Sequence, residues 1–356
     1  MHFRVTIKDI AALAGVSPGT VDRVLHKRGN VSSKAREQIE RAMQELNYEP
    51  NYFASALAHN RTLQVKVLLP DYRSDLYWEQ PYAGVEKAAH AARHFGCQVD
   101  WFFFNLDNAE DFCKQSAQIL ESSPDVLLFA PIFQEEAEHT LQVCAAAGVQ
   151  AVLINTNLED QQALCYVGQD SFQSGVLAGK LLALSVSPGD ALLILHLDKQ
   201  ISDAKHLLEK ERGLRHFFEQ HAAVAIHRIE LESFEDSELL RQTLLLFFEE
   251  YPAVKAVFVS NSRAYRVLDA LGSDFPADIR LVGFDLIPPN LNYLESGQID
   301  FLINQNPAQQ GYQAIMNVVD YFIFKRAVER VQYLPLDIVV AENAAYYISR
   351  LEGTEA

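Results

Sequence analysis

Residues 6–26 read TIKDIAALAGVSPGTVDRVLH, and this stretch predicts two short helices joined by a tight turn. Apolar residues recur at helical spacing before the turn; they are Ile7, Ile10, Ala11, Leu13 and Ala14. Thr6 and Asp9 stand three residues apart, as in an N-terminal capping box. Gly15 can adopt the left-handed conformation that commonly ends a helix. The first helix should therefore run from just after Thr6 to just before Gly15.

The residues after Gly15 predict a second helix. Ser17 is a good N-cap, and Pro18 suits the first helical position because a missing N–H costs nothing there. Its inner face would carry Val21, Val24 and Leu25. Two short helices joined in this way form a helix-turn-helix, whose second helix can enter the major groove of DNA.

The letters GVSPG, residues 15–19, also match the G-x-S-x-G pattern of serine hydrolases. That motif lifts the serine out of a turn between a buried strand and a helix. The preceding residues have helical and not strand periodicity, and too few of them precede Ser17 to form a sheet. The pattern is therefore not expected to be a nucleophile elbow.

A third helix is predicted from about Ser33 to Leu46, ended by Pro50. With this helix, residues 6–51 resemble the DNA-binding head of the lactose-repressor (LacI/GalR) family almost residue for residue. The resemblance implies DNA contacts from Ser17, Pro18, Gly19, Thr20, Arg23, His26, Ser32, Asn51, Ala54 and Leu57. Asp22 stands where the family usually has serine, so it either points away from DNA, pairs with Arg23 or Lys27, or rejects some DNA bases.

Residues 51–62 form a short polar segment whose helical signal is weak, so by itself it fits an ordinary linker. The resemblance instead implies a hinge helix that pairs with its dimer mate on DNA. There Leu57 would wedge between base pairs in the minor groove, and Ala54 would allow close approach. Tyr52 and Phe53 are unusual at this place and could pack on the core instead.

Composition supports a chain of two parts. The length of 356 residues suits two to three domains, and 49% apolar residues suffice for buried cores. The net charge is −17, but residues 1–62 hold nine Lys and Arg against six Asp and Glu, which leaves −20 for the rest. With no signal peptide and no apolar run near 18 residues, a cytoplasmic protein without membrane contact is expected. The four cysteines have no metal-site spacing and are expected to be reduced core residues.

From residue 63 onward, short apolar runs alternate with helical stretches. The runs cover residues 65–70, 98–104, 125–131, 151–155, 190–197, 227–231, 256–261 and 280–285. This alternation indicates parallel sheets covered by helices on both faces, and the number of strands favours two lobes with a cleft. The region resembles the periplasmic sugar-binding fold that forms the effector core of the same family.

The expected domains are therefore a head (1–50), a hinge (51–62) and an effector-binding, dimerising core (63–350). In the core, lobe 1 would hold about 63–172 and 304–332, and lobe 2 about 173–303 and 333–350.

Ligands of such folds bind beyond the carboxyl ends of strands. Polar residues at those ends are Asn155, Asn261, Asp285 and Gln305; each could be a turn residue, but together they match family positions that bind sugar hydroxyls. Tyr72, Tyr77 and Trp78 could stack on a sugar ring. Lys210, or Arg212 nearby, falls where the family has a sugar-binding arginine. Asp170 fits a helix cap first and a ligand contact second.

These observations predict a homodimeric transcriptional regulator, more a repressor than an activator, that binds a near-palindromic operator under the control of an effector. The effector would be a sugar or a derivative, with phosphorylated and acidic ligands left open. The alternative is a regulator whose core responds to a protein partner. No catalytic residue, metal or cofactor is expected, because the sequence motifs of nucleotide, zinc and hydrolase sites are absent or lack their context.

Overall fold

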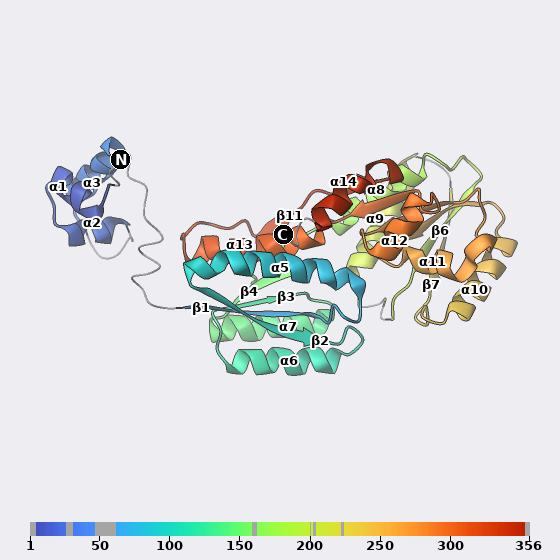
Figure 1. Ribbon diagram of the computed structural model, residues 1–356, viewed down its shortest axis with the longest axis horizontal. Coiled ribbons are helices and arrows are strands. Elements are labelled where there is room, and N and C mark those ends of the chain that lie inside the picture. Colours follow the sequence, from blue (N-terminus) through green and yellow to red (C-terminus); the bar gives the residue numbers. More distant parts are fainter. Residues whose placement is uncertain are drawn as a thin grey trace. The chain divides into compact units, whose positions relative to one another are not determined.

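The computed structural model describes residues 5–25, 31–46, 62–158, 162–199, 201, 204–221 and 224–352 (Figure 1). The chain divides into two compact units, Met1–Asn60 and Arg61–Ala356. The predicted DNA contacts His26, Asn51, Ala54 and Leu57 lie outside the described residues, as does the predicted hinge up to residue 61.

The first unit is a helical head with three described helices, α1 (Ile7–Ala14), α2 (Pro18–Leu25) and α3 (Ser33–Glu45). The predicted capping box is present, since the Thr6 side chain accepts from the Asp9 N–H and the Asp9 carboxylate accepts from the Thr6 N–H. Gly15 ends α1 with φ 64° and ψ 33°, as predicted. The fully buried side chains of Ile10, Val21 and Ile39 bring one residue from each helix into a common core.

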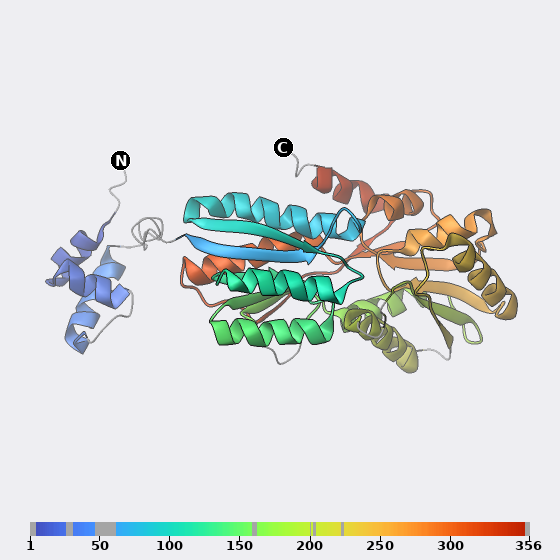
Figure 2. The same cartoon turned by 90° about the horizontal axis from the view of Figure 1, so that it is seen from below.

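The second unit contains two six-stranded sheets, one in each lobe (Figures 1 and 2). In sheet order, lobe 1 contains β11 (Val331–Tyr333), β5 (Cys165–Gly168), β4 (Gln150–Asn155), β3 (Val126–Phe129), β1 (Leu63–Pro70) and β2 (Cys97–Phe104). Lobe 2 contains β12 (Asp337–Val339), β10 (Phe301–Asn304), β9 (Arg280–Phe284), β8 (Val254–Val259), β6 (Ala191–His196) and β7 (Ala225–Glu230). Only the β10–β12 pair is antiparallel among these described strands.

The prediction of two parallel sheets in two lobes is confirmed, but four strands were not predicted. These are β5, β10, β11 and β12, which have only three or four residues each. So few residues give no usable periodicity, and β11 and β12 are partly exposed. Pairing with a neighbouring strand, and not local sequence, places these segments in the sheets.

Helices cover both faces of each sheet, and apolar side chains fill the space between them. In lobe 1, α5 (Glu79–Ala92) and α13 (Pro307–Phe322) cover one face, and α6 (Ala109–Glu121) and α7 (Gln134–Ala147) the other. In lobe 2, α8 (Ser171–Leu182) and α9 (Lys205–His221) cover one face. The other face is covered by α10 (Ser237–Glu250), α11 (Ala264–Leu271), α12 (Pro288–Glu295) and α14 (Ala341–Glu352).

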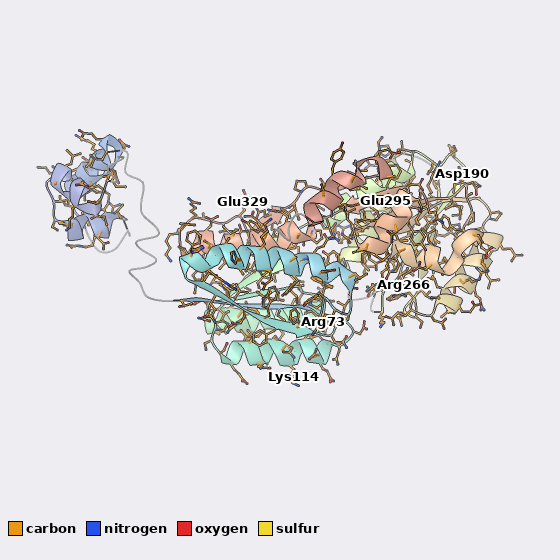
Figure 3. All side chains as sticks on the ribbon, in the orientation of Figure 1. Arg73, Lys114, Asp190, Arg266, Glu295 and Glu329 are labelled. Carbon is orange, nitrogen blue, oxygen red and sulfur yellow. The ribbon has the colours of Figure 1, made fainter. Side chains whose placement is uncertain are left out.

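Charged side chains lie on the outside of both lobes (Figure 3). Exposed examples are Lys114 on lobe 1 and Glu295 on lobe 2.

The four cysteines are free thiols, and Cys97, Cys144 and Cys165 are buried as predicted. Cys113 is exposed, contrary to the prediction, because it lies on the solvent side of α6. Within the described residues, no helix is both long and apolar enough to span a bilayer.

The chain passes between the lobes three times, after β5, after β10 and between β11 and β12. Three short turns, the 3-10 helices η1 (Leu76–Trp78), η2 (Arg93–Phe95) and η3 (Gly272–Asp274), complete the described elements. Because the chain crosses between the lobes three times, a movement of one lobe can be transmitted to the other through the backbone.

Glycine permits a very close crossing of α8 and α9. A Cβ atom on Gly175 would lie 1.9 Å from the carbonyl oxygen of Lys210, and one on Gly213 would lie 2.0 Å from that of Phe172. No side chain fits at either place. The two glycines therefore set the distance between the helices and, with it, the position of Lys210.

We expect Gly175→Ala to lower the free energy of unfolding by about 1–3 kcal/mol, because the added methyl group overpacks a backbone contact. Thermal and urea unfolding would measure this loss. Lys180→Ala, at an exposed position on the same helix, is the control and should stay within about 0.5 kcal/mol of wild type. Equal stabilities of the two variants would contradict the close crossing.

Candidate functional site

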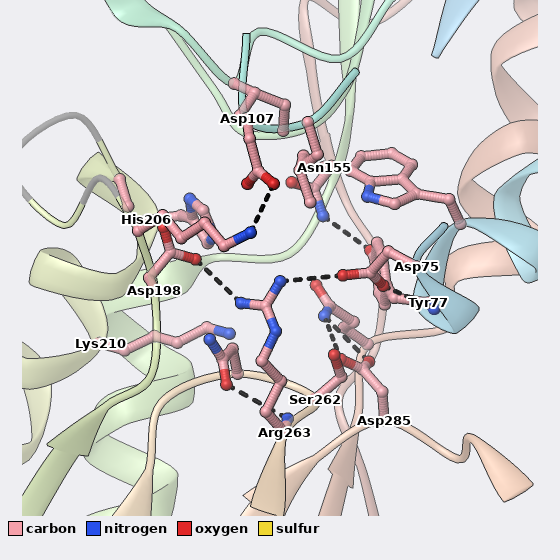
Figure 4. A pocket seen from close by; sticks show the side chains of 17 residues that line it. Asp75, Tyr77, Asp107, Asn155, Asp198, His206, Lys210, Ser262, Arg263 and Asp285 are labelled. Atoms are coloured by element: carbon pink, nitrogen blue, oxygen red, sulfur yellow. Dashed lines mark hydrogen bonds and ion pairs between the residues drawn. The ribbon is translucent and has the colours of Figure 1, made fainter. Parts of the chain in front are cut away.

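A pocket lies between the lobes, at the carboxyl ends of their parallel strands (Figure 4). We call it the inner pocket, and it is lined by Asp75, Tyr77, Trp78, Leu106, Asp107, Ile132, Asn155, Asp198, Lys199, Ala204, His206, Lys210, Asn261, Ser262, Arg263, Asp285 and Gln305. Seven of the eight residues predicted to contact an effector are among these. The topology explains this gathering, since parallel strands end at the same edge of each sheet.

Two of the strand-end residues have left-handed backbone conformations. Asn155 has φ 70° and Asp285 has φ 67°, and both side chains are buried. Asn and Asp tolerate this region better than other residues with a Cβ, but it still costs free energy. In both cases the unusual turn occurs where the side chain lines the pocket.

Asp285 is the most deeply buried carboxylate of the pocket, with 1% of its area exposed. The Gln305 Nε2 donates to both of its oxygens at 2.9 Å, and the Gln305 Oε1 accepts from Gln169 at 2.6 Å. Burial raises the pKa of Asp285, while the positive charge of Lys210 opposes that rise. The ionised form of Asp285 is therefore stabilised mainly by Lys210 and Gln305.

Lys210 faces Asp285 from helix α9 and is also almost fully buried. Its Nζ donates to the carbonyl oxygen of Ser260 at 3.0 Å and lies 3.5 Å from the centroid of the Phe284 ring. Burial lowers the pKa of Lys210, and the attraction of Asp285 counteracts this. Arg212, the other residue considered for this place, pairs with Glu209 on the exposed side of the helix.

The aromatic residues divide between the pocket and the outside. Tyr77 and Trp78 are buried in the pocket wall, and the Tyr77 hydroxyl accepts from the Asn155 Nδ2 at 2.7 Å. Tyr72 differs from the prediction, because its ring stacks on Tyr82 at 4.4 Å and does not line the pocket. Asp170 caps α8 by accepting from the Gln173 N–H at 2.9 Å, as predicted, and it too lies off the pocket wall.

Asn261 forms part of the wall next to an arginine that the sequence analysis missed. Its Nδ2 donates to the Leu197 carbonyl at 2.9 Å. Arg263 donates from one nitrogen to Asp198 at 3.0 Å and from the other to Asp75 at 2.9 Å, as Figure 4 shows. Because Asp75 belongs to lobe 1 and Arg263 to lobe 2, this ion pair links the lobes. The available signal was an arginine two residues beyond the predicted apolar run 256–261.

A chain of hydrogen bonds behind the pocket resembles a catalytic triad. The Ser260 hydroxyl and His196 Nδ1 lie 2.8 Å apart, and His196 Nε2 and Glu211 lie 2.8 Å apart. Ser260 and His196 have no exposed area, and neither lines the inner pocket. Ser260 therefore cannot meet a substrate in the pocket. These hydrogen bonds join β6, the residue that follows β8, and α9.

In the head, the described residues predicted to meet DNA lie at the start of α2, in its last turn (Arg23) and at the N-cap of α3 (Ser32). Ser17, Pro18, Gly19 and Arg23 are exposed, and Thr20 is half-buried. The Ser17 hydroxyl accepts from the Thr20 N–H at 3.2 Å, which caps the helix as predicted. The Arg23 Nε donates to the Gly19 carbonyl at 3.1 Å. Ser32 is exposed and caps α3.

His206, another residue that the sequence analysis missed, carries a pH dependence that can be measured. Burial and the charges of Lys210, Arg263 and His196 lower its pKa to about 3. The folded protein therefore holds His206 neutral at pH values where the unfolded chain already binds a proton. The contribution of neutral His206 to the free energy of unfolding is complete above the ordinary pKa near 6.5, and it is lost as the pH falls toward 3.

We therefore expect the free energy of unfolding of wild type to fall relative to that of His206→Asn by about 1–2 kcal/mol between pH 7 and pH 5. Urea unfolding at several pH values would measure the difference. His216→Asn, an exposed position on the same helix, should follow wild type over this range. A constant gap between wild type and His206→Asn would show that His206 takes up its proton normally.

Comparison with known proteins agrees with both parts of the structure. Residues 6–51 match the lacI family of bacterial regulatory proteins, and residues 65–326 match the periplasmic binding protein domain. The transcriptional regulator MalR of Streptococcus pneumoniae is 24% identical over 303 residues, which cover 81% of this chain and 85% of MalR. The ribose operon repressor of Bacillus subtilis is 27% identical over 292 residues, covering 80% of this chain and 82% of the repressor.

Solved structures give the same result. A crystal structure described as a LacI transcriptional regulator from Bacteroides fragilis is 26% identical, with a TM-score of 0.73, and covers 81% of this chain and 100% of its own. The glucose-galactose binding protein GanP of Geobacillus stearothermophilus shares the fold, with a TM-score of 0.69 at 21% identity and coverage of 80% and 99%. The chain belongs to the LacI family of bacterial transcriptional regulators, with a periplasmic binding protein domain as its core.

Proposed function

We propose that this DNA-binding regulator represses transcription as a homodimer on a near-palindromic operator, and that a sugar held in the inner pocket controls its affinity for DNA. The observation that carries the proposal is the composition of the pocket. Amides, carboxylates and two aromatic rings converge between two lobes, in a chain that also has a helix-turn-helix head.

The polar groups of the pocket suit a ligand with many hydroxyls. Asn155 and Asn261 each offer a donor and an acceptor, and Asp285 accepts only. Sugar hydroxyls both donate and accept, while the apolar face of the ring suits Tyr77 and Trp78. The relatives named as a ribose operon repressor and a glucose-galactose binding protein support the same class of ligand.

Control of DNA binding requires that the effector prefer one arrangement of the lobes. The pocket is lined from both lobes, so a ligand in it contacts both at once and favours the closed arrangement. By linkage, the arrangement that binds the effector must differ in operator affinity, and the coupling acts equally in both directions.

The alternative, control by a protein partner, has less support because polar side chains from both lobes converge on a small pocket inside the cleft. Thermal unfolding with a panel of sugars separates the two hypotheses. A ligand that binds only the native state raises the melting temperature, by an amount that grows with the logarithm of its concentration relative to its dissociation constant. The proposal would fail if no sugar, sugar acid or sugar phosphate raised the melting temperature.

For DNA recognition, we propose that the exposed start of α2 enters the major groove. Ser17, Pro18 and Gly19 would form the tip, Thr20 would lie beside it, and Arg23 would bind a base or a phosphate. A two-fold dimer presents two such helices, so two similar half-sites are expected.

We expect Arg23→Ala to weaken operator binding by about 1–3 kcal/mol, because it removes a charged donor from the recognition helix. Fluorescence anisotropy with a labelled operator would measure the loss. Arg41→Ala removes the same charge from an exposed position on α3 and should have a much smaller effect. Equal losses in both variants would reduce the role of Arg23 to general electrostatic attraction.

We expect Asp285→Asn to weaken binding of the effector found in the sugar panel by at least about tenfold, since a buried carboxylate that accepts ligand hydroxyls is lost. Because the pKa of Asp285 is raised, wild-type affinity should fall with decreasing pH earlier than for an ordinary aspartate, and the variant should lack this fall. Calorimetry between pH 8 and pH 5 would test both effects.

Asp269→Asn, at an exposed aspartate of α11, is the control. It should retain wild-type affinity and the wild-type pH profile. If Asp285→Asn instead lowers the melting temperature but binds the effector normally, Asp285 serves the turn after β9 and does not contact the ligand.

A further inference from the structure

A second and larger hollow adjoins the inner pocket. We call it the outer groove; its volume is about 660 Å³, against about 80 Å³ for the inner pocket. Six residues line both hollows, and they are Asp75, Leu106, Asp107, Lys199, Ser262 and Arg263. These six form a partition between the inner pocket and the outer groove.

Arg263 is the best-held residue of the partition. One guanidinium nitrogen binds Asp75 at 2.9 Å, and the other binds both Asp198 at 3.0 Å and the carbonyl oxygen of Leu197 at 2.9 Å. The guanidinium lies 4.6 Å from the centroid of the Phe234 ring, and only 15% of the side chain is exposed. A planar fork engaged on both sides has little freedom to swing away.

Asp75 connects the partition to the aromatic wall. One of its oxygens accepts from the Tyr77 N–H at 3.0 Å, and the other binds Arg263. A second link between the lobes lies close by, where the Lys199 ammonium donates to Asp107 at 2.7 Å. The partition thus contains two ion pairs, each of which joins lobe 1 to lobe 2.

The inner pocket is small enough for this partition to limit its ligand. Its volume of about 80 Å³ corresponds to roughly five to eight water molecules, at 10–15 Å³ of such volume for each. A hollow of this size favours a ligand of one ring over a ligand of two rings. A second ring could be accommodated only in the outer groove, past Arg263.

The charges of the inner pocket are already matched among its own residues. Four aspartates line it against the three cations Lys199, Lys210 and Arg263. Lys199 and Arg263 are bound to carboxylates, and Lys210 faces Asp285. His206 adds no charge near neutral pH, because its pKa is lowered to about 3. Among the described residues of this wall, an anionic ligand would find no unpaired cation and an excess of carboxylates.

We propose that Arg263, held by Asp75 across the cleft, determines the specificity of the pocket for one uncharged sugar ring, and that it excludes disaccharides and sugar phosphates. This inference rests on the proposed function, because it assumes a sugar in the pocket. Arg263 acts by closing the wall between the two hollows, and Asp75 acts by positioning Arg263.

The test compares ligands of one and two rings on the full-length protein. The panel contains ribose, glucose, galactose and fructose, the disaccharides maltose, sucrose and lactose, and the 6-phosphates of glucose and fructose. Melting temperatures find the ligands that bind, and calorimetry then gives the dissociation constants. We expect wild type to bind one monosaccharide at least about 100-fold more tightly than any disaccharide or phosphate that contains it.

In Arg263→Ala the ratio of disaccharide to monosaccharide dissociation constants should fall at least about tenfold, because the two hollows merge. Asp75→Asn should shift the ratio in the same direction. It retains an oxygen that can accept from the Tyr77 N–H, so it serves as the second variant if Arg263→Ala does not fold. Arg280→Ala, which breaks an exposed ion pair with Asp300 in lobe 2, is the matched control and should leave the ratio unchanged.

Three outcomes would overturn the inference. A disaccharide or a sugar phosphate that binds wild type as tightly as its parent sugar removes it and leaves the proposed function intact. An unchanged ratio in folded Asp75→Asn and Arg263→Ala also removes it, because Arg263 then does not separate the hollows. Absence of binding by every sugar, sugar acid and sugar phosphate tested removes the proposed function and this inference together.

Discussion

Parallel pairing of the strands is the constraint on which the site depends. In a parallel sheet all strands end on the same side, so β8, β9 and β10 deliver their following residues to one place in lobe 2, and β4 does the same in lobe 1. The residues that follow both sets of strands line the same pocket. Beyond the carboxyl ends of the strands, the backbone groups no longer pair with a neighbouring strand, which favours polar side chains and turn conformations there. Asn155 and Asp285 show both features, since each is polar and has a positive φ.

The pocket that results holds more buried charge than a neutral ligand requires. Burying Asp285 and Lys210 costs free energy that their mutual attraction offsets only in part, and the hydrogen bonds from Gln305 and to Ser260 reduce the remaining cost. Such a pair contributes little to stability as such. It does place one acceptor and one donor at defined, buried positions, where each hydrogen bond to a ligand counts for more.

The links between the lobes indicate how a small ligand could influence the DNA-binding head. Arg263 with Asp75 and Lys199 with Asp107 hold the cleft closed, and three strand crossings join the lobes behind it. In the structure these ion pairs are made, and an open arrangement in which they would be broken is the second state that control by an effector requires. A ligand that contacts both walls changes the balance between the two, and this is the condition for allosteric control.

By itself, the sequence determined the features that depend on neighbouring residues. The capping box at Thr6 and Asp9, the left-handed Gly15 and the cap at Ser17 involve residues within a few positions, and all three are present. The long apolar strands and the polar residues at their ends were also predictable, because a buried strand of five or more residues has a distinct composition.

The tertiary structure alone decided which of these residues meet. Tyr72 and Tyr77 lie in one loop and have the same chemistry, yet one ring packs on Tyr82 and the other lines the pocket. Arg263 gave only a weak signal, because its partners Asp75 and Asp198 are 188 and 65 residues away along the chain. The short strands β11 and β12 exist only through their pairing with β5 and β10. Contacts between residues distant in sequence depend on how the lobes close on each other, and no local pattern records that geometry.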